Sequence, residues 1–214
     1  MRRNHFGTAA LVALGLFACK SSDKGAATGE SVTKAADQID QGILELDATI
    51  ASLHTLVDQP TGDLTAHRKG FEKELSKLED TAEDLAKTAT AMKERGQEYF
   101  AQWKEQLATI QNEDLRERSD ERREEIESKL NELQTDYQEA KGAFEPLLAN
   151  LRDIRTALKA DSTVGGVEAV APAVKSADKD AGKVSKELRD LAERFRELGV
   201  NMSRVNAAKE AQEK

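Results

Sequence analysis

The chain has 214 residues, with 32 Lys and Arg against 40 Asp and Glu, so its formal net charge is −8. Charged residues make up 34% of the sequence and aromatic residues only 4%, which leaves little of the bulky apolar material that fills the core of an α/β enzyme. The acidic balance provides no basic footprint, so we expect no nucleic-acid partner. With 3 prolines, the composition favours long helices or coiled coils.

The first 18 residues have the layout of an export signal. Arg2 and Arg3 precede a mostly apolar run from Phe6 to Ala18, after which the sequence turns polar. As a helix this run would measure about 20 Å, which is too short for a hydrocarbon core of about 30 Å. We therefore predict that residues 1–18 are a signal peptide that is removed, and not a membrane span.

The end of this run, Leu16, Phe17, Ala18 and Cys19, resembles the lipobox of bacterial lipoproteins, in which a small residue precedes the modified cysteine. The resemblance implies a diacylglycerol thioether on Cys19, cleavage before it and acylation of the freed amine. The alternative is a lone cysteine in an ordinary secretory signal. Two or more acyl chains hold a protein durably on a bilayer, so we expect a membrane anchor at Cys19.

The residues after the cysteine bear on the final location. The residue after the cysteine is Lys20 and not Asp, which resembles the pattern of lipoproteins that are sorted to the outer membrane. We therefore expect a cell-envelope protein that faces the periplasm. Residues 19–30 contain the lipidated cysteine and a small, polar stretch, which as a flexible tether would reach about 18 Å. The predicted folded part, residues 31–214, would therefore stand off the bilayer.

Apolar residues from Val32 onward recur at alternating spacings of three and four, which is the pattern of a coiled-coil seam. Ser31 and Asp114 are candidate N-caps for the first and third segments. The pattern predicts four helices, over about residues 31–57, 63–111, 114–159 and 167–208. The predicted fold is all-α, an elongated antiparallel helical bundle or coiled coil of three long helices and one shorter helix.

Short motifs are spread along these segments: Gly62-Asp63-Leu64, Tyr99-Phe100 with Trp103, Leu115-Arg116 with Ser119, Phe144-Glu145-Pro146-Leu147-Leu148, and Leu151-Arg152-Asp153. Together with the lipobox they resemble an uncharacterised family of bacterial lipoproteins that is classed as a domain of unknown function. The likeness covers roughly Val32 to Val205. It implies a helical envelope lipoprotein and brings no known catalytic or ligand-binding residues.

Candidate residues for metal binding and catalysis are few. Four-helix bundles hold di-iron sites through Glu-x-x-His pairs. Here the residue three positions before His54 is Ala51, and the residue three positions before His67 is Leu64, so neither histidine has the glutamate. The sequence contains no nucleophile elbow, P-loop or dinucleotide fingerprint. We therefore expect no metal, no cofactor and no enzymatic activity.

Two local features remain as candidate functional residues. Tyr99, Phe100 and Trp103 include the only tryptophan, and Tyr99 and Trp103 fall on the predicted seam. They either fill the end of the bundle near the turn or form a patch where a partner docks. Pro146 removes a helical hydrogen bond and its ring presses on residue Gly142, which predicts a kink. This kink lets the helix follow its neighbours, or acts as a hinge.

The preferred hypothesis is a non-enzymatic, lipid-anchored envelope protein that serves as a scaffold, spacer or adaptor. It would contact the membrane through its lipid, and an envelope protein or a second copy through its helices. The second hypothesis is a regulatory binding module that acts on an envelope enzyme through the aromatic end or the kink. An enzyme that acts on the cell wall is a distant third.

Overall fold

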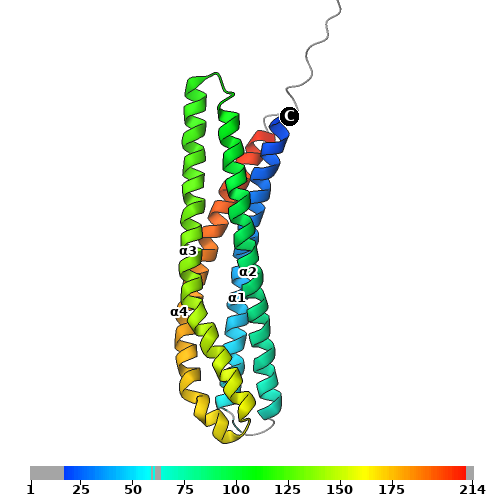
Figure 1. Cartoon of the computed structure of the whole chain (residues 1–214), viewed down its shortest axis with the longest axis vertical. Helices are drawn as coiled ribbons and strands as arrows, with labels where there is room; N and C mark the ends of the chain where they lie inside the picture. Colours follow the sequence, from blue (N-terminus) through cyan, green and yellow to red (C-terminus); the bar gives the residue numbers. More distant parts are fainter. Residues whose placement is uncertain (1–16, 59, 61–63, 211–214) are drawn as a thin grey trace, which may run out of the picture.

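The computed structural model describes residues 17–58, 60 and 64–210, nearly all of them in four long helices (Figure 1). These helices are α1 (Phe17–Asp58), α2 (Leu64–Leu107), α3 (Glu113–Ala160) and α4 (Val164–Glu210). They run alternately up and down, α1 and α3 each pack between α2 and α4, and the described residues contain no strand. The prediction of an elongated, all-α antiparallel bundle is confirmed.

The prediction that one helix is shorter is wrong, because α1 extends upstream of residue 31. It has 42 residues, against 44, 48 and 47 in α2, α3 and α4. Thr28 and Ser31 are buried against the bundle, and the Ser31 hydroxyl donates to a backbone carbonyl four residues earlier at 2.8 Å, so Ser31 lies inside the helix and does not cap it. Residues 19–30 are helical, and the prediction of a flexible tether is also wrong.

Two turns are fixed by side-chain caps. Asn112, and not Asp114, is the N-cap of α3, because its Oδ1 accepts a hydrogen bond from the Leu115 amide at 3.1 Å. At the next turn the Thr163 hydroxyl accepts a hydrogen bond from the Gly166 amide at 3.3 Å, so α4 begins at Val164, slightly before the predicted start at residue 167.

The core consists of two clusters stacked along the bundle axis. The lower cluster in Figure 1 comprises the buried apolar residues between Leu46 and Leu56, Phe71 and Leu78, Leu147 and Leu158, and Val167 and Val184. The upper cluster comprises those between Val32 and Ile43, Met92 and Phe100, Ile126 and Ala140, and Leu191 and Met202.

The four interfaces of the bundle differ in closeness. Helices α1 and α4 pack closely, since a Cβ atom at Gly199 would lie 2.5 Å from Thr33 Oγ1. An ion pair joins Arg196 to Asp40 along the same interface. Helices α2 and α3 are the least closely packed neighbours. Between Leu78 and Met92, α2 contributes no fully buried side chain. The bundle is therefore open on its α2–α3 face, between the two clusters.

Candidate functional site

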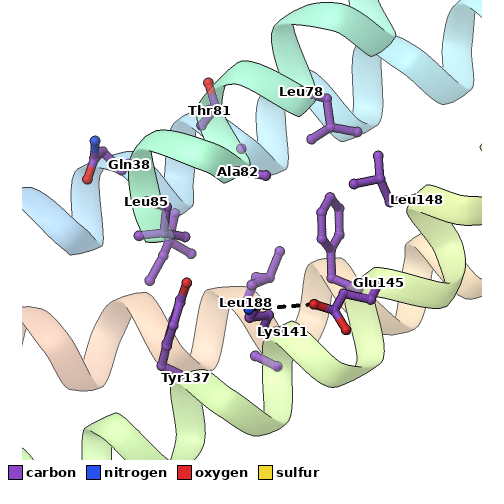
Figure 2. A pocket seen from close by; sticks show the side chains of 14 residues that line it. Gln38, Leu78, Thr81, Ala82, Leu85, Tyr137, Lys141, Glu145, Leu148 and Leu188 are labelled. Carbon is purple, nitrogen blue, oxygen red and sulfur yellow. Dashed lines mark ion pairs between the residues drawn. The ribbon is translucent and has the colours of Figure 1, made fainter. Parts of the chain in front are cut away.

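A cavity of about 150 Å³ occupies this opening, midway along the bundle (Figure 2). We call it the apolar cavity, because its exposed lining is almost entirely carbon. All four helices contribute to it. Figure 2 shows Leu78 and Leu148 at one end, and Leu85 and Tyr137 at the other.

The apolar cavity exists because short side chains meet where the two core clusters adjoin. Ala82 of α2 and Ala140 of α3 both line it, and neither reaches across the space between the helices. Helix α3 also changes direction in its yellow-green part (Figure 1). Pro146 lies inside α3, where it removes a backbone hydrogen bond.

Polar groups stand at the mouth of the apolar cavity. Lys141 Nζ lies 3.6 Å from Glu145 Oε1, one turn further along α3, and both side chains are exposed. Tyr137 is buried, and burial together with the nearby Glu145 carboxylate raises the pKa of its phenol. The Gln38 Oε1 atom is buried without a hydrogen-bond partner among the described residues.

A second, open pocket of about 660 Å³ adjoins the first and shares Tyr137 and Lys141 with it. We call it the polar pocket. Its remaining polar lining residues are Thr90, Lys93, Asn131, Gln134, Thr135 and Gln138. Two lysines thus face this pocket, and no carboxylate belongs to its lining, in a chain of net charge −8.

The burial of the three aromatic residues at the upper end of the bundle differs from the prediction. Phe100 is the buried member, whereas Tyr99 and Trp103 are half-buried. The seam of α2 runs through Gly96 and Phe100, four residues apart, so that Tyr99 lies at its edge. The ring of Tyr99 packs on α1 instead, because a Cβ atom at Gly25 would lie 3.0 Å from it.

These three rings form one cluster that also reaches α3. The centroid of Tyr99 lies 5.2 Å from that of Phe100 and 5.5 Å from that of Trp103. The Trp103 indole donates a hydrogen bond to Ser119 Oγ at 3.2 Å. The cluster therefore joins α1, α2 and α3, which supports the prediction that it fills the end of the bundle, while docking of a partner there stays a prediction.

The other predicted residues are spread along the chain. Leu16 lies outside the described residues, and Phe17, Ala18 and Cys19 form the first three residues of α1. Gly142 has open space around it, since a Cβ atom there would meet nothing within 4 Å. A hinge at Gly142 and Pro146 stays a prediction.

Metal ligands do not gather anywhere in residues 17–58, 60 and 64–210, where no group of three or more His, Cys, Asp and Glu side chains could hold an ion. None of the helices in that part of the chain is long and apolar enough to cross a membrane. His54 faces Asp178 of α4 at 3.2 Å on the surface.

Sequence reasoning missed two features of the structure, of which only the second belongs to the site. One is Arg123, which is buried at 8% exposure and paired with Asp120, Glu124 and Glu127 at 2.7, 3.1 and 2.5 Å. The sequence could have indicated this cluster, because the acids lie one turn before, directly after and one turn after Arg123. The other is the apolar cavity, which the run of Ala and Thr residues between Leu78 and Met92 could have indicated.

The fold and the site define a class, namely an antiparallel four-helix bundle with an opening between its second and third helices. Comparison with known families then identifies the family. The family described as "Protein of unknown function (DUF2959)" matches residues 22–197, which is most of the chain, and the protein belongs to this family. Neither the curated proteins nor the solved structures include a significant match.

Proposed function

We propose that the protein is a non-enzymatic, lipid-anchored component of the cell envelope that acts as a helical scaffold or adaptor. The observation that carries the proposal is the position of Cys19. It is the only cysteine of the chain, it follows an apolar run that ends in Leu16, Phe17 and Ala18, and it is the third residue of the long helix α1.

An acyl anchor at Cys19 would attach the bundle by one end. From Cys19 to its end, α1 extends about 60 Å, so the turns at the opposite end would lie about that far from the lipid. Gly25, which is buried against Tyr99, follows Cys19 by about 9 Å of helix. The bundle would therefore rise directly from the surface of the membrane and act as a spacer. Because Lys20 follows the cysteine, we propose the outer membrane, with the bundle in the periplasm.

The aromatic end supports a second candidate function, a regulatory module that binds an envelope protein. Leu115 is 56% exposed and lies one turn from Ser119, which contacts Trp103. Trp103 and Leu115 thus offer a partly exposed apolar surface at the end of the bundle where the anchor would lie. A partner bound there would sit close to the membrane.

Metabolic labelling with a palmitate analogue tests the anchor. We expect label on the wild-type chain and none on Cys19→Ala, because no other thiol exists in the sequence. The wild type should also sediment with membranes, and the variant should not. Equal labelling of both chains would contradict the anchor.

Co-purification from detergent-solubilised membranes separates the two candidate functions. A stoichiometric enzyme among the co-purifying proteins would favour the regulatory module, and a structural envelope component would favour the scaffold.

A further inference from the structure

We propose that the opening between α2 and α3 binds a single-chain amphiphile with an anionic head group. The tail would lie in the apolar cavity and the head in the adjoining polar pocket. Tyr137 and Lys141, which line both spaces, would stand where the tail meets the head. This binding site is independent of how the chain is attached to the membrane.

The apolar cavity suits a hydrocarbon tail. An enclosed cavity of this volume, lined by Leu, Ile and Phe, holds a group of about the size of benzene, so the space of about 150 Å³ has room for part of a hydrocarbon tail. Here Ile39, Leu78, Leu85 and Phe144 are among the lining residues. Because this cavity opens between α2 and α3, a chain longer than such a group can continue outward instead of ending at a closed wall.

The polar pocket suits an anionic head. Lys93 and Lys141 supply positive charge, Asn131, Gln134 and Gln138 supply amide donors, and no carboxylate among the lining residues repels an anion. Among the residues that line the two spaces, the one acid is Glu145, at the mouth of the apolar cavity. Its distance of 3.6 Å from Lys141 exceeds that of a good hydrogen bond and both groups are exposed, so this pair is weak and Lys141 can turn to a ligand.

The proposed lipid on Cys19 cannot fill this site. Residues 19 and 38 both lie in α1, and Gln38 lines the apolar cavity, so about 28 Å of helix separate the two positions. An acyl chain spans about half of a hydrocarbon core, or about 15 Å. The ligand would therefore be a separate molecule.

Titration with sodium decanoate, kept below the concentration at which it forms micelles, tests the proposal. The protein is the full chain carrying Cys19→Ser, prepared without detergent, so that neither an attached lipid nor a surfactant competes. Calorimetry should show saturable binding at one site. Amide resonances of Ala82 and Ala140, which line the apolar cavity, should shift in NMR spectra of the same sample.

Variants separate the tail from the head. Ala82→Leu fills the apolar cavity and should abolish binding. Lys141→Gln should weaken decanoate by about tenfold through the loss of one charge-assisted contact, and should leave decanol, which has the same tail without the charge, unaffected. Lys179→Gln, at an exposed position of α4 outside both spaces, is the matched control and should bind as the wild type. Decyl phosphate, titrated in parallel, shows whether a carboxylate or a phosphate head fits better.

Three results would overturn the proposal. They are no saturable binding of decanoate, amide shifts confined to residues away from α2 and α3, or binding by a helical Ala82→Leu variant that equals the wild type. Circular dichroism establishes that each variant is folded. If Ala82→Leu does not fold, the NMR shifts of the chain that carries only Cys19→Ser still test the proposal.

Discussion

The glycines of the bundle meet different surroundings, and these decide what a single methyl group does. At Gly166, a Cβ atom would lie 2.2 Å from the carbonyl oxygen of Asp161, in the tight turn before α4. At Gly142, the same atom would meet nothing within 4 Å. At Gly96 it would lie 2.4 Å from the end of the buried Leu130 side chain. A side chain at Gly166 would therefore collide with the backbone, one at Gly142 would meet no obstacle, and one at Gly96 would displace Leu130.

Substitution by alanine should therefore raise stability at Gly142 and lower it at Gly166. Gly142→Ala removes a flexible residue from the interior of α3 and should raise the free energy of unfolding by about 0.5–1 kcal/mol. Gly166→Ala forces the turn apart and should lower it by about 1–3 kcal/mol. Urea denaturation followed by circular dichroism measures both. Loss of stability in Gly142→Ala would show that α3 needs a glycine at the proposed hinge.

Between elements, one carboxylate ties α2 to α3 below the apolar cavity. Glu79 of α2 accepts hydrogen bonds from Arg152 at 2.6 Å and from Arg155 at 2.8 Å, both on α3. Burial acts to raise the pKa of Glu79, but hydrogen bonds from Arg155 and Arg152 outweigh burial and hold the pKa below its usual value of 4.5. This contact partly compensates for the sparse apolar packing between the two helices.

The stabilising effect of Glu79 should depend on pH. Since the folded pKa is lower than the unfolded pKa, the carboxylate stabilises the bundle above about pH 4.5, and this contribution is lost as the pH falls through the folded value. Glu79→Gln should cost about 1 kcal/mol at pH 7 and approach zero cost in acid.

Unfolding by urea at several pH values measures the effect. Glu83→Gln is the control, because Glu83 pairs with Lys87 within the same helix at 2.8 Å and should contribute only a few tenths of a kcal/mol. A cost of Glu79→Gln that did not change between neutral and acidic pH would contradict the assignment.

Sequence periodicity was sufficient for the helices and insufficient for their contacts. The three-four spacing predicted the bounds of α2, α3 and α4 to within a few residues, because it follows directly from helix geometry. The upstream part of α1 was missed, since its small and polar residues carry no apolar seam. It packs on the bundle instead through contacts such as that of Gly25 with Tyr99. Which of Tyr99 and Phe100 is buried likewise depends on α1, which no spacing along α2 reveals.

The candidate site depends on register across the whole bundle. The apolar cavity requires Ala82 and Ala140 to lie at one level, yet they belong to different helices and are far apart in the chain. Local patterns predict which face of each helix is buried, but not which residues stand opposite one another. For this reason the sequence pointed to the aromatic end and the kink, and the opening between α2 and α3 came only from the structure.

On the scale of the molecule, the two core clusters imply unequal stability along the bundle. Between residues 35 and 46, α1 buries Ala35, Ala36, Ile39, Ile43 and Leu46. The facing part of α2, residues 81–91, has only half-buried and exposed side chains. Backbone hydrogen bonds break locally where few apolar contacts hold a helix in place, so this part of α2 should open more often than α1 does.

Hydrogen exchange of the folded protein measures this difference. Amides of residues 81–91 should exchange at least about tenfold faster than those of residues 35–46, which corresponds to about 1.4 kcal/mol less free energy of local opening. Ala82→Leu, which adds apolar contacts in the cavity, should slow exchange in α2 and leave α1 unchanged. Equal protection of both stretches in the wild type would mean that the bundle opens only as a unit, and that the two clusters behave as one core.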